Sequence, residues 1–330
     1  MAVNLTPQYH EAEAAYKKAQ TPEQKMECLK RMWVEIPKHK ASEKLQAELK
    51  TKISNLRDEI EDGKGKNKKA GPSFKIPKQG AGQVMILGAP NCGKSRLLAA
   101  LTRATPEVAP YPFTTREPYP GMMEWEDVRV QLVDTPPITP DFMESYISSM
   151  IRSADAAVLM LDLQDDDGIT AMEAVIERLA QVKTILVKEL PENIEDPTID
   201  YCRTFVAASK LDTDDAAIRL EMAKEALGNR FEIHPYDSET GNGLEALRDH
   251  IYRFLNVIRI YSKRPGKPAD MESPFTCPVG SSVLDMAEKV HGDIAEKLKS
   301  ARIWGTGVFE GQTVTRDHIL HDKDIVELHT

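Results

Sequence analysis

The sequence predicts an α/β fold in which a doubly wound, mostly parallel sheet follows an N-terminal helical hairpin and precedes a smaller α+β module. From residue 83 onward, short apolar runs alternate with longer amphipathic segments, which is the pattern of such a sheet. Before residue 63, apolar residues recur instead at spacings of three and four, the period of a helix. Two stretches with several Gly, Pro and Lys residues, 63–80 and 259–273, separate the three parts as linkers.

The N-terminal part, residues 1–62, is expected to form the helical hairpin. Thr6 and Thr21 are each followed by a proline, which is typical of an N-cap residue with Pro at the first helical position. Between 41 and 62 a narrow apolar stripe runs along a charged helix, and it either completes the hairpin or binds a partner helix. The stripe consists of Leu45, Leu49, Ile53, Leu56 and Ile60.

Charge is unevenly distributed along the chain. The whole chain has 330 residues and a net charge of −9, which excludes a general polycation. Residues 1–80, which include the basic linker 63–80, carry 17 Lys and Arg against 11 Asp and Glu, a net charge of about +6. This arm favours contact with an anionic partner, although a solvated helical face would account for the same charges.

The remaining composition points to a cytoplasmic protein that does not enter membranes. The four cysteines are far apart and lack metal-ligand or redox spacing, so we expect reduced thiols. No apolar stretch approaches 18 residues and no signal peptide is recognisable.

The central part, residues 81–258, is expected to contain the doubly wound sheet. The stretch 188–200 holds two prolines and five acids, which predicts a loop. Strands are predicted at 83–88, 119–124, 128–134, 155–162, 201–208 and 231–236. Helices are predicted at 94–103, 141–152, 169–183, 213–228 and 243–257.

The C-terminal module, residues 274–330, follows the linker 259–273. A helix near 282–291 is predicted, with Ser281 or Ser282 as its N-cap. Its buried stripe is Val283, Met286, Ala287 and Val290. Strands are expected at 302–304 and 324–328.

Residues 88–95 form the motif G-x4-G-K-[ST], the phosphate-binding loop. An apolar strand precedes the motif and a helix follows it, so backbone amides and the helix N-terminus can face a polyphosphate together. Lys94 is expected to reach the β- and γ-phosphates, and Ser95 to ligate Mg²⁺. The expected nucleotide contacts here are Gly88, Ala89, Pro90, Asn91, Cys92, Gly93, Lys94, Ser95 and Arg96.

Two further residues are expected at the metal. Thr115 lies twenty residues after Ser95, where a mobile threonine can close on Mg²⁺ and the γ-phosphate. Asp134 ends an apolar strand and is expected to be the carboxylate that lies just behind the direct ligands of Mg²⁺. The predicted metal set is therefore Ser95, Thr115 and Asp134.

Two loops after later strands fit a guanine base. Asp212 can accept hydrogen bonds from N1 and N2 of guanine, which adenine cannot offer, and Lys210 would lie over the base. These residues belong to the run Ser209 to Asp212, and the second loop begins Asp237, Ser238, Glu239. A backbone amide of the second loop can bind guanine O6. An ATPase or a small-molecule kinase is the competing interpretation, and Asp212 argues against it.

Together these motifs resemble the Obg family of translational GTPases, and most closely its DRG (developmentally regulated GTP-binding) branch. The resemblance includes 53–59, the Tyr-Pro-Phe-Thr-Thr run at 111–115, Pro120 with Gly121, and 255–261. The tail, through 283–291 and 301–305, is similar to a TGS domain, a ubiquitin-like roll. The small domain that DRG proteins insert in the GTPase core is absent, because only a short loop occupies 186–200.

This resemblance implies a P-loop NTPase-type G domain that binds GTP and GDP with Mg²⁺ and hydrolyses GTP slowly. It also implies contact with ribosomes or RNA, and with a protein partner, through the N-terminal helices or the TGS domain. Asn91, Lys94 and Thr115 are the implied catalytic residues. In GTPases with a similar Gly-x-Pro-Asn loop, the residue equivalent to Asn91 helps hold K⁺ between the β- and γ-phosphates.

The sequence departs from the family pattern at three motifs. Pro137 stands where the third motif has a glycine whose amide bonds the γ-phosphate, and proline has no N–H. Ile138 stands where Ras-like enzymes carry a water-orienting Gln, as in the Obg pattern. Ser209 replaces Asn, and 237–239 replaces Ser-Ala-Lys. A nucleotide-binding scaffold that does not hydrolyse GTP is therefore the alternative function, and Pro137 is the residue that favours it.

Overall fold

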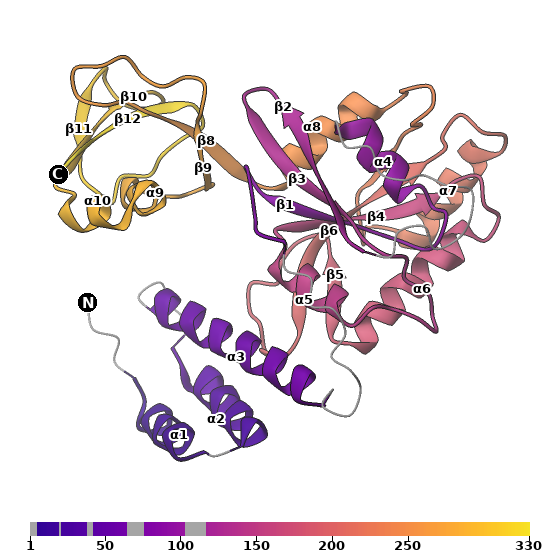
Figure 1. Cartoon of the computed structure of the whole chain (residues 1–330), viewed down its shortest axis with the longest axis horizontal. Helices are drawn as coiled ribbons and strands as arrows, with labels where there is room; N and C mark the ends of the chain where they lie inside the picture. The colour runs from indigo at the N-terminus through magenta and orange to yellow at the C-terminus, as the bar shows by residue number, and fades with distance from the viewer. Residues whose placement is uncertain (1–4, 20, 38–41, 65–75, 103–116) are drawn as a thin grey trace.

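The chain contains a helical arm, a central α/β domain and a C-terminal α+β domain (Figure 1). None of the helices described is both long and apolar enough to cross a bilayer. The computed structural model describes residues 5–19, 21–37, 42–64, 76–102 and 117–330, except for the side chains of 43–44 and 58–64.

The arm has three helices where the sequence predicted a hairpin: α1 (Pro7–Lys18), α2 (Pro22–Glu35) and α3 (Glu43–Lys64). The expected caps are confirmed. The Thr6 side chain accepts a hydrogen bond from the Tyr9 amide, and Thr21 forms a reciprocal capping box with Gln24. Helix α3 also includes 63–64, the start of the predicted linker, most of which lies outside the described residues. The buried residues of the arm include Leu29, Trp33, Leu49, Ile53 and Leu56.

The central domain is built on a seven-stranded sheet with the order β2-β3-β1-β4-β6-β5, in which β7 also pairs with β6. All of its strand pairs are parallel except β2–β3. The strands are β1 (Gln83–Leu87), β2 (Tyr119–Trp125), β3 (Val128–Asp134), β4 (Ala156–Asp162), β5 (Thr184–Val187), β6 (Asp200–Ser209) and β7 (Ile233–Pro235).

Two helical layers cover the two faces of this sheet, as a doubly wound fold requires. In β4, Ala157, Leu159 and Leu161 pack into one core while their neighbours Val158 and Met160 pack into the other. Helices α5 (Tyr146–Ser153), α6 (Gly168–Gln181) and α7 (Ala216–Leu227) contribute to the first core, and α4 (Lys94–Leu101) and α8 (Leu244–Phe254) to the second. The predicted fold class is thereby confirmed.

The C-terminal domain is a five-stranded sheet with the order β11-β10-β12-β8-β9, packed against α9. Ser282, rather than Ser281, caps α9 in a capping box with Asp285. The expected stripe is confirmed for Val283, Met286 and Ala287, which are buried. The elements are β8 (Val257–Ser262), β9 (Phe275–Pro278), α9 (Val283–Val290), α10 (Gly292–Lys297), β10 (Ser300–Trp304), β11 (Gln312–Val314) and β12 (Asp324–His329).

Three sequence predictions were wrong in part. The expected linker 259–273 begins inside β8, so the C-terminal sheet starts directly after α8. The helix expected at 141–152 starts later, at Tyr146. Strand β5 was missed because it has only four residues and directly follows an amphipathic helix.

Both appended parts contact the central domain through an arginine. Arg57 of α3 donates to the carbonyl oxygens of Val182 (2.8 Å) and Thr198 (3.0 Å), and it pairs with Asp200 at 2.5 Å. Arg259 of β8 pairs with the β2–β3 turn, and its guanidinium lies 4.9 Å from the centre of the Trp125 ring. The carboxylates that Arg259 contacts are Glu126 and Asp127 of that turn, together with Asp322 of its own domain.

Candidate nucleotide-binding site

The loop at 88–95 has the backbone shape that its glycines permit. Gly93, the N-cap of α4, has a φ of 96°, in the left-handed region that disfavours residues with a side chain. A Cβ on Gly88 would lie 2.6 Å from the Cys92 sulfur and 2.9 Å from Met160 Cβ, so only glycine fits there. Asn91 is exposed at the tip with a φ of 59°. The loop is thus a tight turn between β1 and α4, as predicted.

Lys94 lies along the inside of this turn. Its ammonium nitrogen donates to the carbonyl oxygens of Gly88 (3.1 Å) and Ala89 (2.7 Å), and the residue is buried. Burial raises the pKa of the neighbouring Cys92 thiol, although Lys94 acts in the opposite direction. The thiol donates to the Ala89 oxygen at 3.0 Å and belongs to the sheet core. Lys94 is therefore the cation at the concave side of the loop.

Ser95 and Asp134 meet at the end of β3. The Ser95 hydroxyl donates to Asp134 Oδ2 at 2.5 Å, and Asp134 is fully buried. A hydroxyl and a carboxylate next to a phosphate loop are the hard oxygen donors that Mg²⁺ prefers, so these residues fit the ion. The third expected metal residue, Thr115, lies outside the described residues, as does the rest of 111–115.

Asp212 is held by the loop that follows β7. Its two carboxylate oxygens accept hydrogen bonds from the Thr240 hydroxyl and from Asn242 Nδ2 (3.0 Å). The two loops expected to read a guanine base therefore touch each other. Asp212 is exposed, so its carboxylate remains accessible from solvent.

Ser209 and Lys210 tie the end of β6 to neighbouring strands. The Ser209 hydroxyl lies 3.1 Å from the carbonyl oxygens of both Cys92 and Leu161, so it links the phosphate loop to β4 and β6. The Lys210 ammonium pairs with Asp162 at 2.5 Å. Sequence reasoning missed Asp162, although its place at the end of an apolar strand was a signal for it.

The loop 237–243 is braced by Asp237. Its Oδ1 accepts from the amides of Glu239 (2.8 Å) and Thr240 (3.1 Å). Burial alone would raise the pKa of Asp237, but these backbone hydrogen bonds outweigh it and lower the pKa. Glu239 pairs with Arg96 of α4, so this ion pair links α4 to the loop 237–243.

The segment after β3 packs against the phosphate loop. The Ile138 amide donates to the Gly88 carbonyl oxygen at 3.1 Å, while its side chain is fully buried in the sheet core. Pro137 is buried as well. Neither residue offers a polar side chain near the loop.

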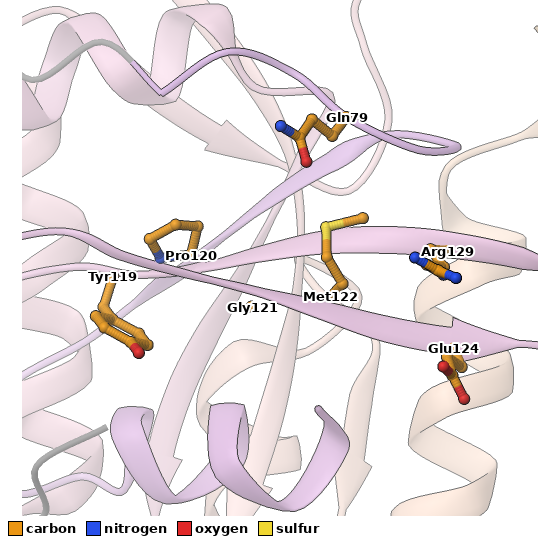
Figure 2. A pocket seen from close by; sticks show the side chains of 7 residues that line it. All are labelled: Gln79, Tyr119, Pro120, Gly121, Met122, Glu124 and Arg129. Carbon is orange, nitrogen blue, oxygen red and sulfur yellow. The ribbon is translucent and has the colours of Figure 1, made fainter. Parts of the chain in front are cut away.

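A separate concave surface lies beside the edge strand β2 (Figure 2). The pocket that this surface encloses has a volume of about 450 Å³. Figure 2 shows Gln79 on the same side of strand β2 as Pro120 and Met122. No residue of the phosphate loop lines it. The remaining lining residues are Tyr119, Gly121, Glu124 and Arg129.

Family comparisons agree with this geometry. Residues 83–189 match the family described as 50S ribosome-binding GTPase, and residues 258–330 match the TGS domain. The chain therefore carries a GTPase domain of this family followed by a TGS domain. This pair of domains, together with relatives named developmentally-regulated GTP-binding proteins that span most of the chain, is consistent with the DRG-like branch of the Obg proteins.

Two relatives illustrate this similarity. An uncharacterized GTP-binding protein of Methanocaldococcus jannaschii is 27% identical over 88% of both chains. The developmentally-regulated GTP-binding protein 2 homolog of Dictyostelium discoideum is 25% identical over 88% of this chain and 94% of its own. The crystal structure of a GTP-binding protein from Pyrococcus horikoshii OT3 aligns with 75% of this chain and 99% of its own, with 17% identity and a TM-score of 0.48.

Proposed function

We propose that this DRG-like chain binds GTP with Mg²⁺ and hydrolyses it slowly to GDP and phosphate as a ribosome- or RNA-associated switch. One observation carries the proposal. The carboxyl edge of the sheet brings together the phosphate loop, the Ser95–Asp134 pair and Asp212. Ligands of open α/β sheets bind at this edge. The description of the matched family as a GTPase gives no support to the alternative of a scaffold that does not hydrolyse GTP.

Each residue near the loop has a proposed role. Lys94 would release its two carbonyl contacts and neutralise the β- and γ-phosphates, while Ser95 and Asp134 would hold Mg²⁺ with Thr115. Bound Mg²⁺ would offset the charge that develops during in-line attack of water on the γ-phosphate. Asn91 would present its side-chain oxygen to K⁺ near the same phosphates.

Slow hydrolysis follows from the segment after β3. Pro137 has no N–H for the γ-phosphate, and the Ile138 amide already donates to Gly88. The buried aliphatic side chain of Ile138 has no group that could orient water. The chain therefore relies on charge neutralisation around the loop.

Base selection is the sharpest test of the proposed function. In Asp212→Asn we expect GTP binding to weaken at least about tenfold, because charge-assisted hydrogen bonds contribute roughly 1.5–3 kcal/mol each. Binding of xanthosine triphosphate should improve, because an Asn amide can donate to the xanthine 2-carbonyl. Asp214→Asn, an exposed neighbour in the same loop, is the matched control.

The measurement is the dissociation constant of each nucleotide by titration, with ATP as a competitor. Unchanged affinities for both nucleotides in Asp212→Asn would show that this loop does not read the base. Equal competition by ATP and GTP would favour an ATPase or a kinase.

The monovalent cation provides a second prediction. We expect wild-type hydrolysis to be faster in K⁺ than in Na⁺, and this difference to disappear in Asn91→Ala. Asn91 has a left-handed backbone, which Asn and Gly tolerate but Ala disfavours. Asn91→Gly is therefore the control that keeps the turn and removes only the side-chain oxygen, and it should lose the difference between K⁺ and Na⁺ as well. Equal initial rates of phosphate release in both salts would remove the role of K⁺.

The variant Pro137→Gly should hydrolyse GTP faster than the wild type. An equal rate of phosphate release would contradict the explanation of slow turnover.

Ribosome or RNA contact is proposed for the basic arm, with the TGS domain as the second surface. Substituting Lys64, Lys66, Lys68 and Lys69 with Gln should weaken cosedimentation with ribosomes and reduce its salt dependence. Undiminished cosedimentation would direct attention to the TGS domain, or to a protein partner.

A further inference from the structure

Glu232, His234 and His250 converge away from the phosphate loop. Glu232 directly precedes β7 and His234 is the middle residue of that strand. Residues two apart in a strand face the same side, so both side chains point in one direction. That side faces α8, which carries His250. Fifteen residues lie between the two histidines in the sequence, and the packing of α8 against β7 brings their rings into contact.

The three side chains are close enough to share one ion. One ligand atom from each lies within 4.8 Å of the other two. Glu232 Oε2 is 3.8 Å from His234 Nε2 and 3.7 Å from His250 Nε2. Tetrahedral bonds of about 2.0–2.2 Å place ligand atoms about 3.4 Å apart. The two distances from Glu232 are within a few tenths of an ångström of that spacing. The imidazoles of His234 and His250 are stacked with ring centres 3.6 Å apart, so the rings would turn toward a shared ion when it binds.

The histidines are in the form that binds metals. His250 Nε2 is buried and has no hydrogen-bond partner among the described residues. Burial lowers the pKa of His234, and it lowers the pKa of His250 to about 4. Burial thus favours the neutral form of both rings, which has a nitrogen lone pair to donate.

The surroundings orient this cluster. Lys188 Nζ lies 3.2 Å from Glu232 Oε1, which leaves Oε2 facing the histidines. The hydrogen bond from Lys188 lowers the pKa of Glu232, so its carboxylate is charged. Phe205 meets both imidazoles edge-on, with ring centres 5.6 Å from His234 and 4.5 Å from His250. An apolar wall on one side strengthens the attraction between a cation and the carboxylate.

The geometry points to a Zn²⁺-type site formed by Glu232, His234 and His250. Two imidazoles and one carboxylate suit Zn²⁺ and its first-row neighbours, whereas Mg²⁺ prefers oxygen ligands alone. Glu232 is 41% exposed, so water can take the fourth position. The site shares no ligand with the proposed Mg²⁺ site at Ser95 and Asp134.

The ion would brace the base-reading loop. Strand β7 leads into that loop at Tyr236, and α8 begins directly after it at Leu244. Linking the strand to the helix holds both ends of 236–243, the segment that contacts Asp212. Zn²⁺ is thus a structural clamp here, because the ligands lie on the supports of the loop and not among its nucleotide-facing groups.

The test is titration of Zn²⁺ alone into the full chain with millimolar Mg²⁺ present. We expect one equivalent to bind, and binding to weaken at least tenfold in Glu232→Gln and in His250→Gln. His291→Gln is the matched control, because His291 is an exposed histidine 3.6 Å from an acid, Asp293, in the C-terminal domain. Circular dichroism checks that each variant is folded.

A measurement on the wild-type protein removes the dependence on variants. Zn²⁺ should shift the side-chain ¹⁵N resonances of His234 and His250 selectively, and Co²⁺ should give the visible absorption of a tetrahedral site. Zn²⁺ affinity that is equal in the control and in both cluster variants would overturn the inference. So would the absence of saturable binding, or ¹⁵N shifts confined to other histidines.

Discussion

The arm and the C-terminal domain are both attached to the central domain by an arginine, but the two arginines contact different kinds of acceptor. Arg57 donates to two backbone carbonyl oxygens and to Asp200, which also pairs with Arg152 at 2.8 Å. Arg259 contacts three carboxylates and is only 4% exposed. The arm therefore contacts mainly backbone carbonyl oxygens next to β5 and β6. The C-terminal domain instead contacts carboxylates, two of which lie in the turn of the β2–β3 hairpin.

That difference gives the two attachments different relations to the nucleotide site. The hairpin β2–β3 ends at Asp134, the carboxylate that contacts Ser95. Arg259 therefore contacts the far end of the strand that carries a proposed Mg²⁺ residue. The carbonyls that Arg57 binds belong to Val182 and Thr198, in segments before β5 and β6. We expect the C-terminal attachment to respond to nucleotide and the arm attachment to be indifferent to it.

Removing Arg259 should have the largest effect. In Arg259→Met we expect a loss of about 2–3 kcal/mol in the free energy of unfolding, because three carboxylates lose one buried partner. Glu126 and Asp322 keep contact with water, which limits the loss. Hydrogen–deuterium exchange should rise in β8 and at the β2–β3 turn.

Arg253→Met is the control for that substitution. Arg253 is a 73% exposed arginine that pairs with Asp249 on the same helix, so its loss should cost under about 0.5 kcal/mol. If the two variants lost equal stability, the network around Arg259 would not be a principal attachment.

The arm should be less sensitive to loss of its arginine. In Arg57→Met we expect a loss of about 1–2 kcal/mol, because Arg152 still pairs with Asp200 while two carbonyls lose a donor. Exchange should rise in α3 and in 188–200, and it should be the same with GDP and with a non-hydrolysable GTP analogue. An arm whose exchange changed with nucleotide would contradict the contrast drawn between the two attachments.

Acid should loosen the C-terminal attachment by a smaller amount. Hydrogen bonds from Arg259 lower the pKa of Glu126, and they outweigh burial to lower the pKa of Asp322. For Asp127, burial is outweighed first by the hydrogen bond from the Tyr261 hydroxyl and then by that from Arg259, so its pKa is lowered as well. A lowered folded-state pKa gives stability that is full above the unfolded value, near 4, and is lost as pH falls below it. Exchange in β8 should therefore rise below about pH 4. In Arg259→Met this additional pH dependence should shrink but not vanish, because Asp127 keeps its hydrogen bond from Tyr261. An unchanged pH dependence in that variant would exclude the Arg259 contacts as its source.

The sequence predicted regular elements well where one pattern extended over a whole element. Helix caps at Thr6 and Thr21 and the apolar run of the strand predicted at 155–162 are local signals, and the structure confirms them. Strand β8 was assigned to a linker because Arg259 interrupts its apolar run and a Pro- and Gly-containing stretch follows. An arginine is buried only with partners, and the three carboxylates that pair with Arg259 lie 63, 132 and 133 residues away in sequence.

The candidate site likewise contains residues that a local motif reveals and contacts that only the folded structure reveals. The phosphate loop, Asp134 and Asp212 are recognisable because each is a short motif at the end of a strand. The contacts of Lys210 with Asp162 and of Arg96 with Glu239 were not predictable, because they depend on which strands and helices are neighbours. The cluster around His250 is hidden for the same reason.

The two-residue joint between α8 and β8 also determines where the chain can be divided. Strand β8 lies between β12 and β9, and it is covalently continuous with the helix that closes the central domain. Division of the chain after 258, where the composition suggests a linker, would cut β8 two residues after its start, so a C-terminal fragment would hold only part of the strand that joins β9 and β12. An isolated C-terminal fragment must therefore start before Val257, within two residues of the last turn of a G-domain helix. Independent folding of either half thus depends on an unusually exact choice of cleavage point.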